Sequence, residues 1–134
     1  MKRVLLTAFE PFDGEAINPS LETARCVAAE SLSSGSVTVA ELPVERLAAI
    51  ELGLKRLRES RPDILIMLGE AGGRYRITPE RIAINVDDFR IPDNAGNQPH
   101  DQPIVRGGPP AYFSTLPIRA ITDRLVSAEI PAAI

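Results

Sequence analysis

The chain has 134 residues, the length of a single domain, and a fold of that size buries about two-thirds of the surface that its unfolded chain exposes. Charged residues make up 25% and hydrophobic residues 44% of the chain, so neither disorder nor membrane insertion is indicated. The net charge of −3, the scattered arginines and the lack of a signal-peptide pattern predict a cytoplasmic protein that binds neither nucleic acid nor membranes.

The first part of the chain predicts a strand followed by a helix. The apolar run at 3–9 indicates a strand, and the proline and glycine after it indicate a loop. Asn18 followed by Pro19 is typical of a helix start, because an asparagine caps the first turn and a proline fits it. We predict a helix of about 14 residues there. Its apolar face comprises Leu21, Ala24, Ala28 and Leu32.

A second strand and helix are predicted at 36–44 and 45–60, and a third strand at 63–70. The second helix carries apolar residues at helical spacing: Leu47, Ile50, Leu54 and Leu57. Within DILIMLGE the residues from Ile64 to Leu68 are all apolar, as in a parallel strand covered on both faces. We therefore predict an α/β fold, a three-layer α/β/α arrangement around a central, mostly parallel, twisted sheet, in one domain over 1–134.

The second part predicts a glycine-rich turn at 71–80 and a strand at 81–86. The region 87–110 is rich in proline and glycine, and we expect it to be an irregular loop. A helix is predicted at 114–128, with Ile118, Ile121 and Leu125 facing inward. The last six residues indicate the start of a further strand, so we expect the domain to be interrupted at its carboxyl end.

The single cysteine, the single histidine and three aspartates are candidates for nucleophilic, acid–base or metal chemistry. Cys26, the single cysteine, falls in mid-helix away from the apolar face, where nothing lowers its pKa, so we expect it to be inert. His100, the single histidine, falls in a polar loop and is expected to be solvated. The spacing of Asp87, Asp88 and Asp93 matches no calcium loop, and aspartates beside proline and asparagine favour Asx turns. We predict no metal site.

Three features at strand ends have both a structural and a functional interpretation. The turn GEAGGR at 69–74 follows a parallel strand, where α/β sheets bind ligands, but it lacks the lysine and hydroxyl of a phosphate loop. Phe9 and Phe12 are either core aromatics or the walls of a pocket for a ring. From its neighbours alone, Glu80 is interpreted as a solvated charge at the entrance of a strand.

Three segments together resemble the pyroglutamyl peptidases of type I, also called pyrrolidone-carboxylate peptidases. They are LLTAFEPFDGEAINPS at 5–20, GEAGGRYRITPERIAINVDDFRIPDNAGNQP at 69–99 and GGPPAYFSTLPIRAI at 107–121, in the order and spacing of the family. Family members remove an N-terminal pyroglutamate from peptides by a Cys-His-acid mechanism on an α/β fold, without a cofactor. They often form dimers or tetramers, and the sequence does not decide the oligomeric state.

The resemblance implies roles for individual residues. Glu80 corresponds to the acid that orients the catalytic histidine, and Arg90 to an arginine near the developing oxyanion. Phe9 and Phe12 correspond to aromatic residues that enclose the pyroglutamyl ring, and Glu70 falls where bacterial relatives usually carry a lactam-binding glutamine. An apolar pocket suits a neutral lactam, which has no ammonium group to pair.

The chain also departs from the family pattern. Asp13 occupies a position where relatives usually carry a second glycine. The nucleophilic cysteine of the family follows a segment like IPAAI, and its histidine comes later still, so we expect both to lie beyond Ile134. Two alternatives stay open: a catalytically inactive pyroglutamyl-binding fragment or module, and an unrelated enzyme on a similar scaffold, such as a nucleoside phosphorylase.

Overall fold

The computed structural model describes residues 1–30, 32–33 and 35–134, and the chain forms two compact units. The first unit comprises Met1–Glu70 and Arg90–Gln98, and the second comprises Ala71–Phe89 and Pro99–Ile134. The chain therefore crosses between the units three times, and the loop that carries Arg90 belongs to the first unit.

The first unit contains a three-stranded parallel sheet. Its strands are β1 (Lys2–Phe9), β2 (Gly35–Leu42) and β3 (Ile64–Met67), in the order β2-β1-β3. Val4 pairs with Val37 on one side and with Ile64 on the other. The predicted parallel arrangement is confirmed, because β1 pairs in parallel with β2 along one edge and with β3 along the other.

Helix α1 (Pro19–Ala29) begins where the sequence predicts. The Oδ1 atom of Asn18 accepts a hydrogen bond from the backbone N–H of Ser20 at 3.0 Å, and Pro19 occupies the first turn. The helix is shorter than the predicted 14 residues, because it ends at Ala29 and Glu30 is already extended. Leu32, which was predicted on the apolar face of the helix, lies outside it and is 42% exposed.

Helix α2 (Arg46–Ser60) was predicted correctly, but the face that it buries was not. Leu47, Ile50 and Leu54 are exposed, whereas Ala49, Leu52 and Leu57 pack against the core. Gly53 also lies on the buried side, because a Cβ at this position would lie 4.0 Å from Leu42, an ordinary contact distance. Only Leu57 belongs to both the predicted and the observed face.

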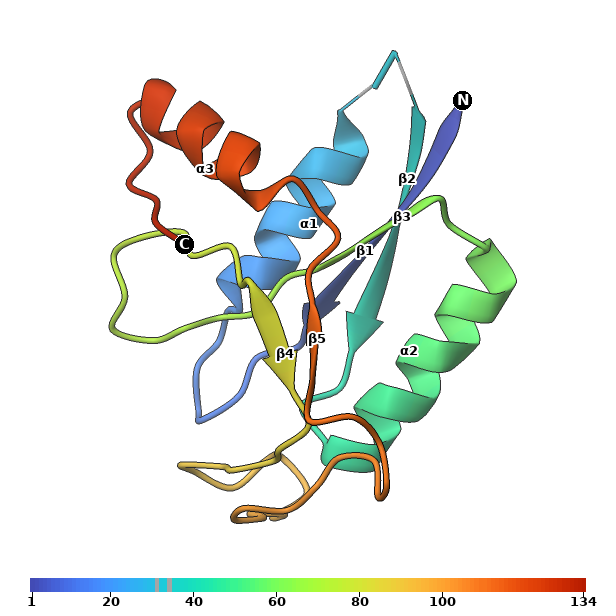
Figure 1. Ribbon diagram of the computed structural model, residues 1–134, viewed down its shortest axis with the longest axis vertical. Helices are drawn as coiled ribbons and strands as arrows, with labels where there is room; N and C mark the ends of the chain where they lie inside the picture. Colours follow the sequence, from blue (N-terminus) through green and yellow to red (C-terminus); the bar gives the residue numbers. More distant parts are fainter. Residues whose placement is uncertain (31, 34) are drawn as a thin grey trace. The chain divides into compact units, whose positions relative to one another are not determined.

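The two helices cover opposite faces of the sheet (Figure 1), so the predicted three-layer architecture is confirmed. On the α1 face the buried residues are Leu6, Ala8, Leu21 and Ala24. On the α2 face they are Leu5, Ala40 and Leu42. Burial of one leucine side chain stabilises a fold by about 1.5–3 kcal/mol, and alternate residues of β1 supply both clusters.

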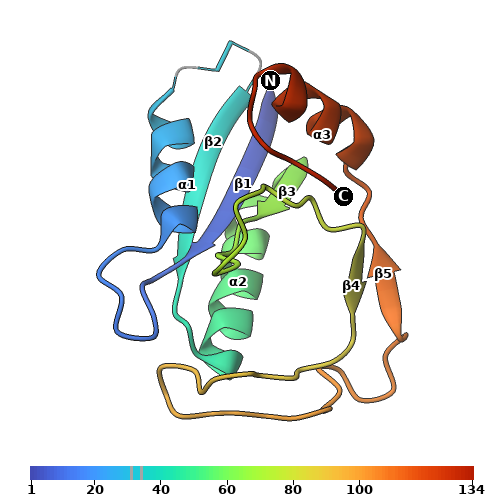
Figure 2. The ribbon, with the colours of Figure 1, turned by 90° about the vertical axis from the view of Figure 1, so that its left-hand side faces the viewer.

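The second unit contains a two-stranded antiparallel sheet and one helix. Its elements are β4 (Ile82–Ile84), β5 (Ala111–Phe113) and α3 (Ile118–Ser127). Figure 2 shows β4 and β5 side by side. The predicted inward face of α3 is confirmed, since Ile118 is buried and Ile121 and Leu125 are half-buried. Strand β5 was not predicted, because only three residues after a proline and glycine run form it.

The irregular loop at 87–110 is confirmed, apart from an isolated bridge between Asp87 and Gln102. The strand expected at 129–134 is reduced to a single parallel bridge between Ile77 and Ala132. The backbone N–H of Ile77 donates to the carbonyl of Pro131 at 2.9 Å, and that of Ala133 donates to the carbonyl of Ile77 at 3.1 Å.

Candidate functional site

Two of the predicted site residues emerge at the same edge of the parallel sheet. Phe9 ends β1, and Glu70 comes three residues after β3 ends at Met67. Thr7 of β1 lies opposite Met67 of β3 in the register. The two parallel strands therefore end at the same carboxyl edge of the sheet, where open α/β sheets bind ligands. Phe9 and Glu70 are both half-buried.

Phe9 is the last residue of β1, and a tight turn follows Phe12. Phe9 packs partly against the core cluster on the α2 face, so it contributes to the core as well as to the edge. Phe12 is half-buried, and its carbonyl accepts a hydrogen bond from the N–H of Glu15 at 3.1 Å. In the turn that follows Phe12, Asp13 has a φ of 54° and Gly14 a φ of 76°. This left-handed conformation favours glycine, although aspartate tolerates it better than most residues do.

Distant parts of the first unit hold the backbone at the end of β1. The N–H of Phe9 donates to Oγ of Ser20 at 3.2 Å, and the N–H of Glu10 donates to the carbonyl of Leu42 at 3.0 Å. The side-chain amide of the fully buried Asn18 donates to the carbonyl of Glu10 at 3.0 Å. The segment that follows Phe9 is therefore fixed by α1 and β2 rather than free.

Asp93 organises the loop that carries Arg90. Its carboxylate accepts hydrogen bonds from the backbone N–H groups of Arg46 at 2.8 Å, Ala95 at 3.0 Å and Asn97 at 2.8 Å. Partial burial acts to raise the pKa of Asp93, but hydrogen bonds from Asn97, Arg46 and Ala95 outweigh it and leave the pKa below its ordinary value. The Asx-type turn predicted here is confirmed, and Asp93 also caps the first residue of α2.

Arg90 itself is exposed in this loop. Its carbonyl accepts a hydrogen bond from Nε2 of Gln98 at 3.1 Å, which joins the two ends of the segment. Asp93 and Asn97 pair between them, with the N–H of Asp93 donating to the carbonyl of Asn97 at 2.9 Å. An ordered loop therefore presents the Arg90 guanidinium to solvent.

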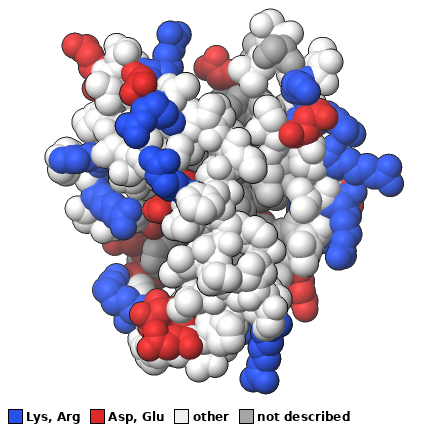
Figure 3. Space-filling model, viewed as in Figure 1, with Lys and Arg blue, Asp and Glu red and all other residues white. Residues whose placement is uncertain are grey.

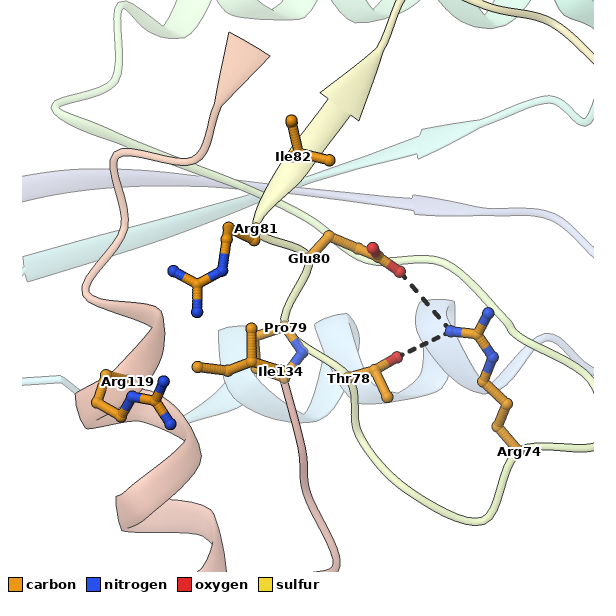
Figure 4. Close-up of a pocket in the computed structure, with 8 residues that line it drawn as sticks. All are labelled: Arg74, Thr78, Pro79, Glu80, Arg81, Ile82, Arg119 and Ile134. Carbon is orange, nitrogen blue, oxygen red and sulfur yellow. Dashed lines mark hydrogen bonds and ion pairs between the residues drawn. The ribbon is translucent and has the colours of Figure 1, made fainter. Parts of the chain in front are cut away.

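Glu80 lies in the second unit, just before β4, and lines a hollow of about 530 Å³ (Figure 4). The residues around it are Arg74, Thr78, Pro79, Glu80, Arg81, Ile82, Arg119 and Ile134. Glu80 points toward Arg74, whereas Arg81 extends on the other side, toward Arg119. The hollow therefore has three guanidinium groups on its walls and the carboxylate of Glu80.

The ion pair between Arg74 and Glu80 is loose and exposed. Nη1 of Arg74 lies 3.7 Å from Oε1 of Glu80 and donates a hydrogen bond to Oγ1 of Thr78 at 3.2 Å. The two side chains of the pair are 56% and 75% exposed. Pairs of this kind contribute 0 to about 1 kcal/mol to stability. The exposure of Glu80 agrees with the interpretation as a solvated strand end, and its role as a catalytic acid stays a prediction.

Cys26 belongs to the first unit and His100 to the second. Cys26 is exposed on α1, as expected from its place outside the apolar face. His100 is exposed too, but its Nδ1 atom lies 3.3 Å from Oδ1 of Asp88, a contact that the sequence did not predict. Both atoms of that pair belong to side chains that are more than half exposed.

The described residues contain neither a group of metal-ligating side chains nor a membrane-spanning helix. Among residues 1–30, 32–33 and 35–134, no three His, Cys, Asp or Glu side chains come together as a metal would require. No helix in this part of the chain has both the length and the apolar character needed to cross a bilayer. On the face drawn in Figure 3, positive and negative side chains are interspersed, and neither forms a broad continuous patch.

The sequence predicted the turn at Asp93 but did not reveal Asn94 and Glu10, which help to fix the loops at the sheet edge. The segment PDNAGN signals turns, because proline, aspartate, asparagine and glycine favour them. It carries no signal for partners such as Arg46 or Pro11, which are distant in sequence. Only the folded chain shows these contacts.

Comparison with known proteins places these residues in a family. The family model described as Pyroglutamyl peptidase matches residues 2–134. A pyrrolidone-carboxylate peptidase of Vibrio campbellii is 52% identical over all 134 residues, and one of Streptomyces coelicolor is 50% identical. The match covers 63% and 62% of those relatives, so the chain spans less than two-thirds of their length.

Solved structures agree. The crystal structure of pyroglutamyl peptidase I from Bacillus amyloliquefaciens matches with a TM-score of 0.94 and 42% identity, over 99% of this chain and 65% of that one. A mutant pyrrolidone carboxyl peptidase from Pyrococcus furiosus matches with a TM-score of 0.94 and 48% identity, over 98% of this chain and 64% of that one.

Proposed function

Because the chain belongs to the pyroglutamyl peptidase family, we propose that it forms part of a cysteine peptidase that removes N-terminal pyroglutamate from peptides. The family match over residues 2–134 is the observation that carries this proposal. In it, these residues supply the acid and the ring pocket, and the cysteine and histidine come from residues outside the 134. We also propose a cytoplasmic location, where a catalytic thiol stays reduced.

Glu80 acts as the third member of a Cys-His-Glu set in this proposal. Its carboxylate accepts a hydrogen bond from the histidine, fixes the tautomer and stabilises the imidazolium that forms when the histidine takes the thiol proton. The thiolate attacks the pyroglutamyl carbonyl, and the C–N bond breaks as the imidazolium protonates the leaving amine. Water then hydrolyses the thioester, which releases pyroglutamate and restores the thiol.

Arg90 stabilises charge in the same reaction. The attack of the thiolate places a negative charge on the carbonyl oxygen, and a fixed cation nearby lowers the barrier. Two features support this role: Arg90 is exposed, and Asp93 and Gln98 order the loop that bears it. An ordered loop costs less reorganisation during the reaction than a mobile one.

Phe9, Phe12 and Glu70 select the substrate ring. Phe9 and Glu70 leave the sheet at one edge, and aromatic walls favour an uncharged five-membered lactam over a charged amino terminus. An ionised Glu70 accepts a hydrogen bond from the lactam N–H but cannot donate one to the lactam carbonyl. Recognition of that carbonyl therefore needs a donor other than Glu70.

A second candidate is a pyroglutamyl-binding module without catalysis. It is favoured by the positions of Cys26, exposed on a helix, and His100, paired with Asp88, neither of which matches a catalytic position of the family. On this alternative the pocket binds pyroglutamate and the peptide bond stays intact.

An assay of the full product of the gene separates these candidates. The product is incubated with a pyroglutamyl peptide, and free pyroglutamate is measured by mass spectrometry before and after alkylation of its thiols. We expect release that alkylation abolishes. Calorimetric binding of pyroglutamate without release would favour the module, and release that survives alkylation would contradict a cysteine mechanism.

A further inference from the structure

The segment between the two pocket phenylalanines is held by a residue of the Arg90 loop. Nδ2 of Asn94 donates to the carbonyl of Pro11 at 3.2 Å and lies 3.1 Å from Oε1 of Glu10. The same Oε1 atom of Glu10 accepts the backbone N–H of Val44 at 3.0 Å. Asn94 therefore joins the segment before Phe12 to two other parts of the first unit.

The backbone of Asn94 is fixed in turn. Its N–H donates to the carbonyl of Val44 at 2.8 Å, and the adjacent Asp93 accepts the N–H of Arg46 at 2.8 Å. Two neighbouring residues of the loop thus bind the connection after β2 and the first residue of α2. From this fixed base the Asn94 side chain reaches Pro11.

The chemistry of the contact requires an amide. A side-chain NH₂ group has two hydrogens, so it can donate to a carbonyl and to a carboxylate at the same time. An aspartate at this position would offer no donor and would face the carboxylate of Glu10. A serine is too short to span the same two acceptors.

We propose that Asn94 is a positioning residue for the pyroglutamyl pocket, which fixes the Glu10–Pro11 segment, and with it Phe12, relative to the loop that bears Arg90. This inference rests on the proposed function, since it assumes that Phe9 and Phe12 enclose the ring and that Arg90 faces the reacting carbonyl. The two bonds of Asn94 are solvent-exposed, so they contribute little to stability. Their effect is on geometry, because small displacements of positioning groups cost much in binding and catalysis.

The test measures steady-state kinetics of the full gene product with a pyroglutamyl aminocoumarin substrate. For Asn94→Ala we expect KM to rise about tenfold, the change that a loss of about 1.4 kcal/mol in binding produces. We expect kcat to fall less than KM rises, and the Tm to change by no more than a few degrees. Asn94→Asp should raise KM further, because its carboxylate repels that of Glu10. If the alanine variant does not fold, Asn94→Ser provides the same measurement.

Asn97→Ala is the matched control. Asn97 is an amide in the same loop, but its side chain binds Asp93 rather than the segment near Phe12. The KM of the Asn97→Ala variant should stay within about twofold of the KM of the parent protein, because the backbone N–H of residue 97 still binds Asp93. An equal rise in KM for both variants would overturn the proposal, since loop order alone would then explain the effect.

Phe12→Ala separates the inference from the proposed function. If this variant raises KM and Asn94→Ala does not, the pocket stands and the role of Asn94 is wrong. If the parent protein is active and Phe12→Ala leaves KM unchanged, the assigned pocket is wrong and the inference falls with it. A parent that cleaves no pyroglutamyl substrate would overturn both.

Discussion

The loops at the sheet edge of the first unit and the Glu80 region of the second unit are built in opposite ways. Phe9 and the segment after it form hydrogen bonds with Ser20, Asn18, Leu42 and Asn94. Glu80 has one ion pair at 3.7 Å, and its side chain is 75% exposed. The backbone around the proposed ring pocket is thus fixed by its own unit, whereas Glu80 would need a further partner, the histidine of the proposal, to fix its side chain.

The largest expected effect follows from replacing Glu80, the proposed catalytic acid. Glu80→Gln in the full gene product should lower kcat by about 10³ to 10⁴, because the histidine loses the carboxylate that fixes its tautomer and stabilises its charge. KM and Tm should change little, since the side chain is exposed. Glu59→Gln, which alters another exposed ion-paired glutamate, should leave kcat unchanged. Equal kcat values for the parent and Glu80→Gln would contradict the assignment.

A pocket variant should show the reverse pattern. Phe12→Ala should raise KM by about 10- to 100-fold, as expected for the loss of about 1.5–3 kcal/mol of apolar contact. Its kcat should fall less than its KM rises. The control is Phe113→Ala, because Phe113 is 72% exposed on β5. A fall in kcat at unchanged KM would show that Phe12 acts in the chemical step rather than in substrate binding.

Replacement of Asp93, which organises the loop that carries Arg90, should lower stability in a pH-dependent way. The pKa of Asp93 is lowered in the folded state, so its contribution is present above the unfolded value of about 4 and is lost as pH falls through the folded pKa. We expect Asp93→Asn to lower Tm by about 5 °C at pH 7 and by less at pH 3. Thermal unfolding of both proteins across this range measures it. Asp123→Asn, at an exposed position of α3, is the control.

The ion pair at Glu80 should matter more for rate than for stability. Arg74→Ala should change the free energy of unfolding by no more than about 0.5 kcal/mol, because the pair is exposed. It should lower kcat by less than about tenfold, the factor that 1.4 kcal/mol represents, with partial recovery in Arg74→Lys. Denaturant unfolding and kinetics on the same samples provide both numbers. A large loss of stability would mean that the second unit depends on this contact.

The smallest expected effect is at the turn after Phe12. Asp13→Gly removes the strain of a left-handed aspartate but adds entropy to the unfolded chain, so we expect a net stabilisation of at most about 0.5 kcal/mol. Urea unfolding of the two proteins measures the difference. A clear destabilisation would show that the Asp13 side chain makes a contact that outweighs the strain.

Local patterns were sufficient to predict most of the fold. Asn18 and Pro19 marked the start of α1, and the apolar run at 64–68 indicated β3, although Met67 is 71% exposed rather than covered. The predicted face of α2 was wrong because Leu47, Ile50 and Leu54 were assumed to face the core, whereas Ala49, Leu52 and Leu57 do so. Apolar residues occur on more than one side of this helix, so the sequence alone does not decide which side is buried.

The site was predicted less completely than the fold. Phe9 and Glu70 could be placed at strand ends from the sequence, because parallel strands leave a sheet at a common edge. The role of Glu80 came only from a family resemblance, since its surroundings indicate a solvated charge. The contacts of Asn94 with Pro11 and Glu10 join residues that are far apart in sequence, so no local pattern could reveal them.

The most direct test compares kcat/KM of the full gene product for a pyroglutamyl substrate and for a prolyl substrate with the same leaving group. The two rings have the same size, but the prolyl ring carries a charged nitrogen and lacks the lactam carbonyl. The aromatic pocket proposed for Phe9 and Phe12 predicts efficient release of pyroglutamate and a prolyl value at least about 10³-fold lower, because apolar walls desolvate the charged ring nitrogen. Comparable values for both substrates, or no cleavage of the pyroglutamyl one, would contradict the account.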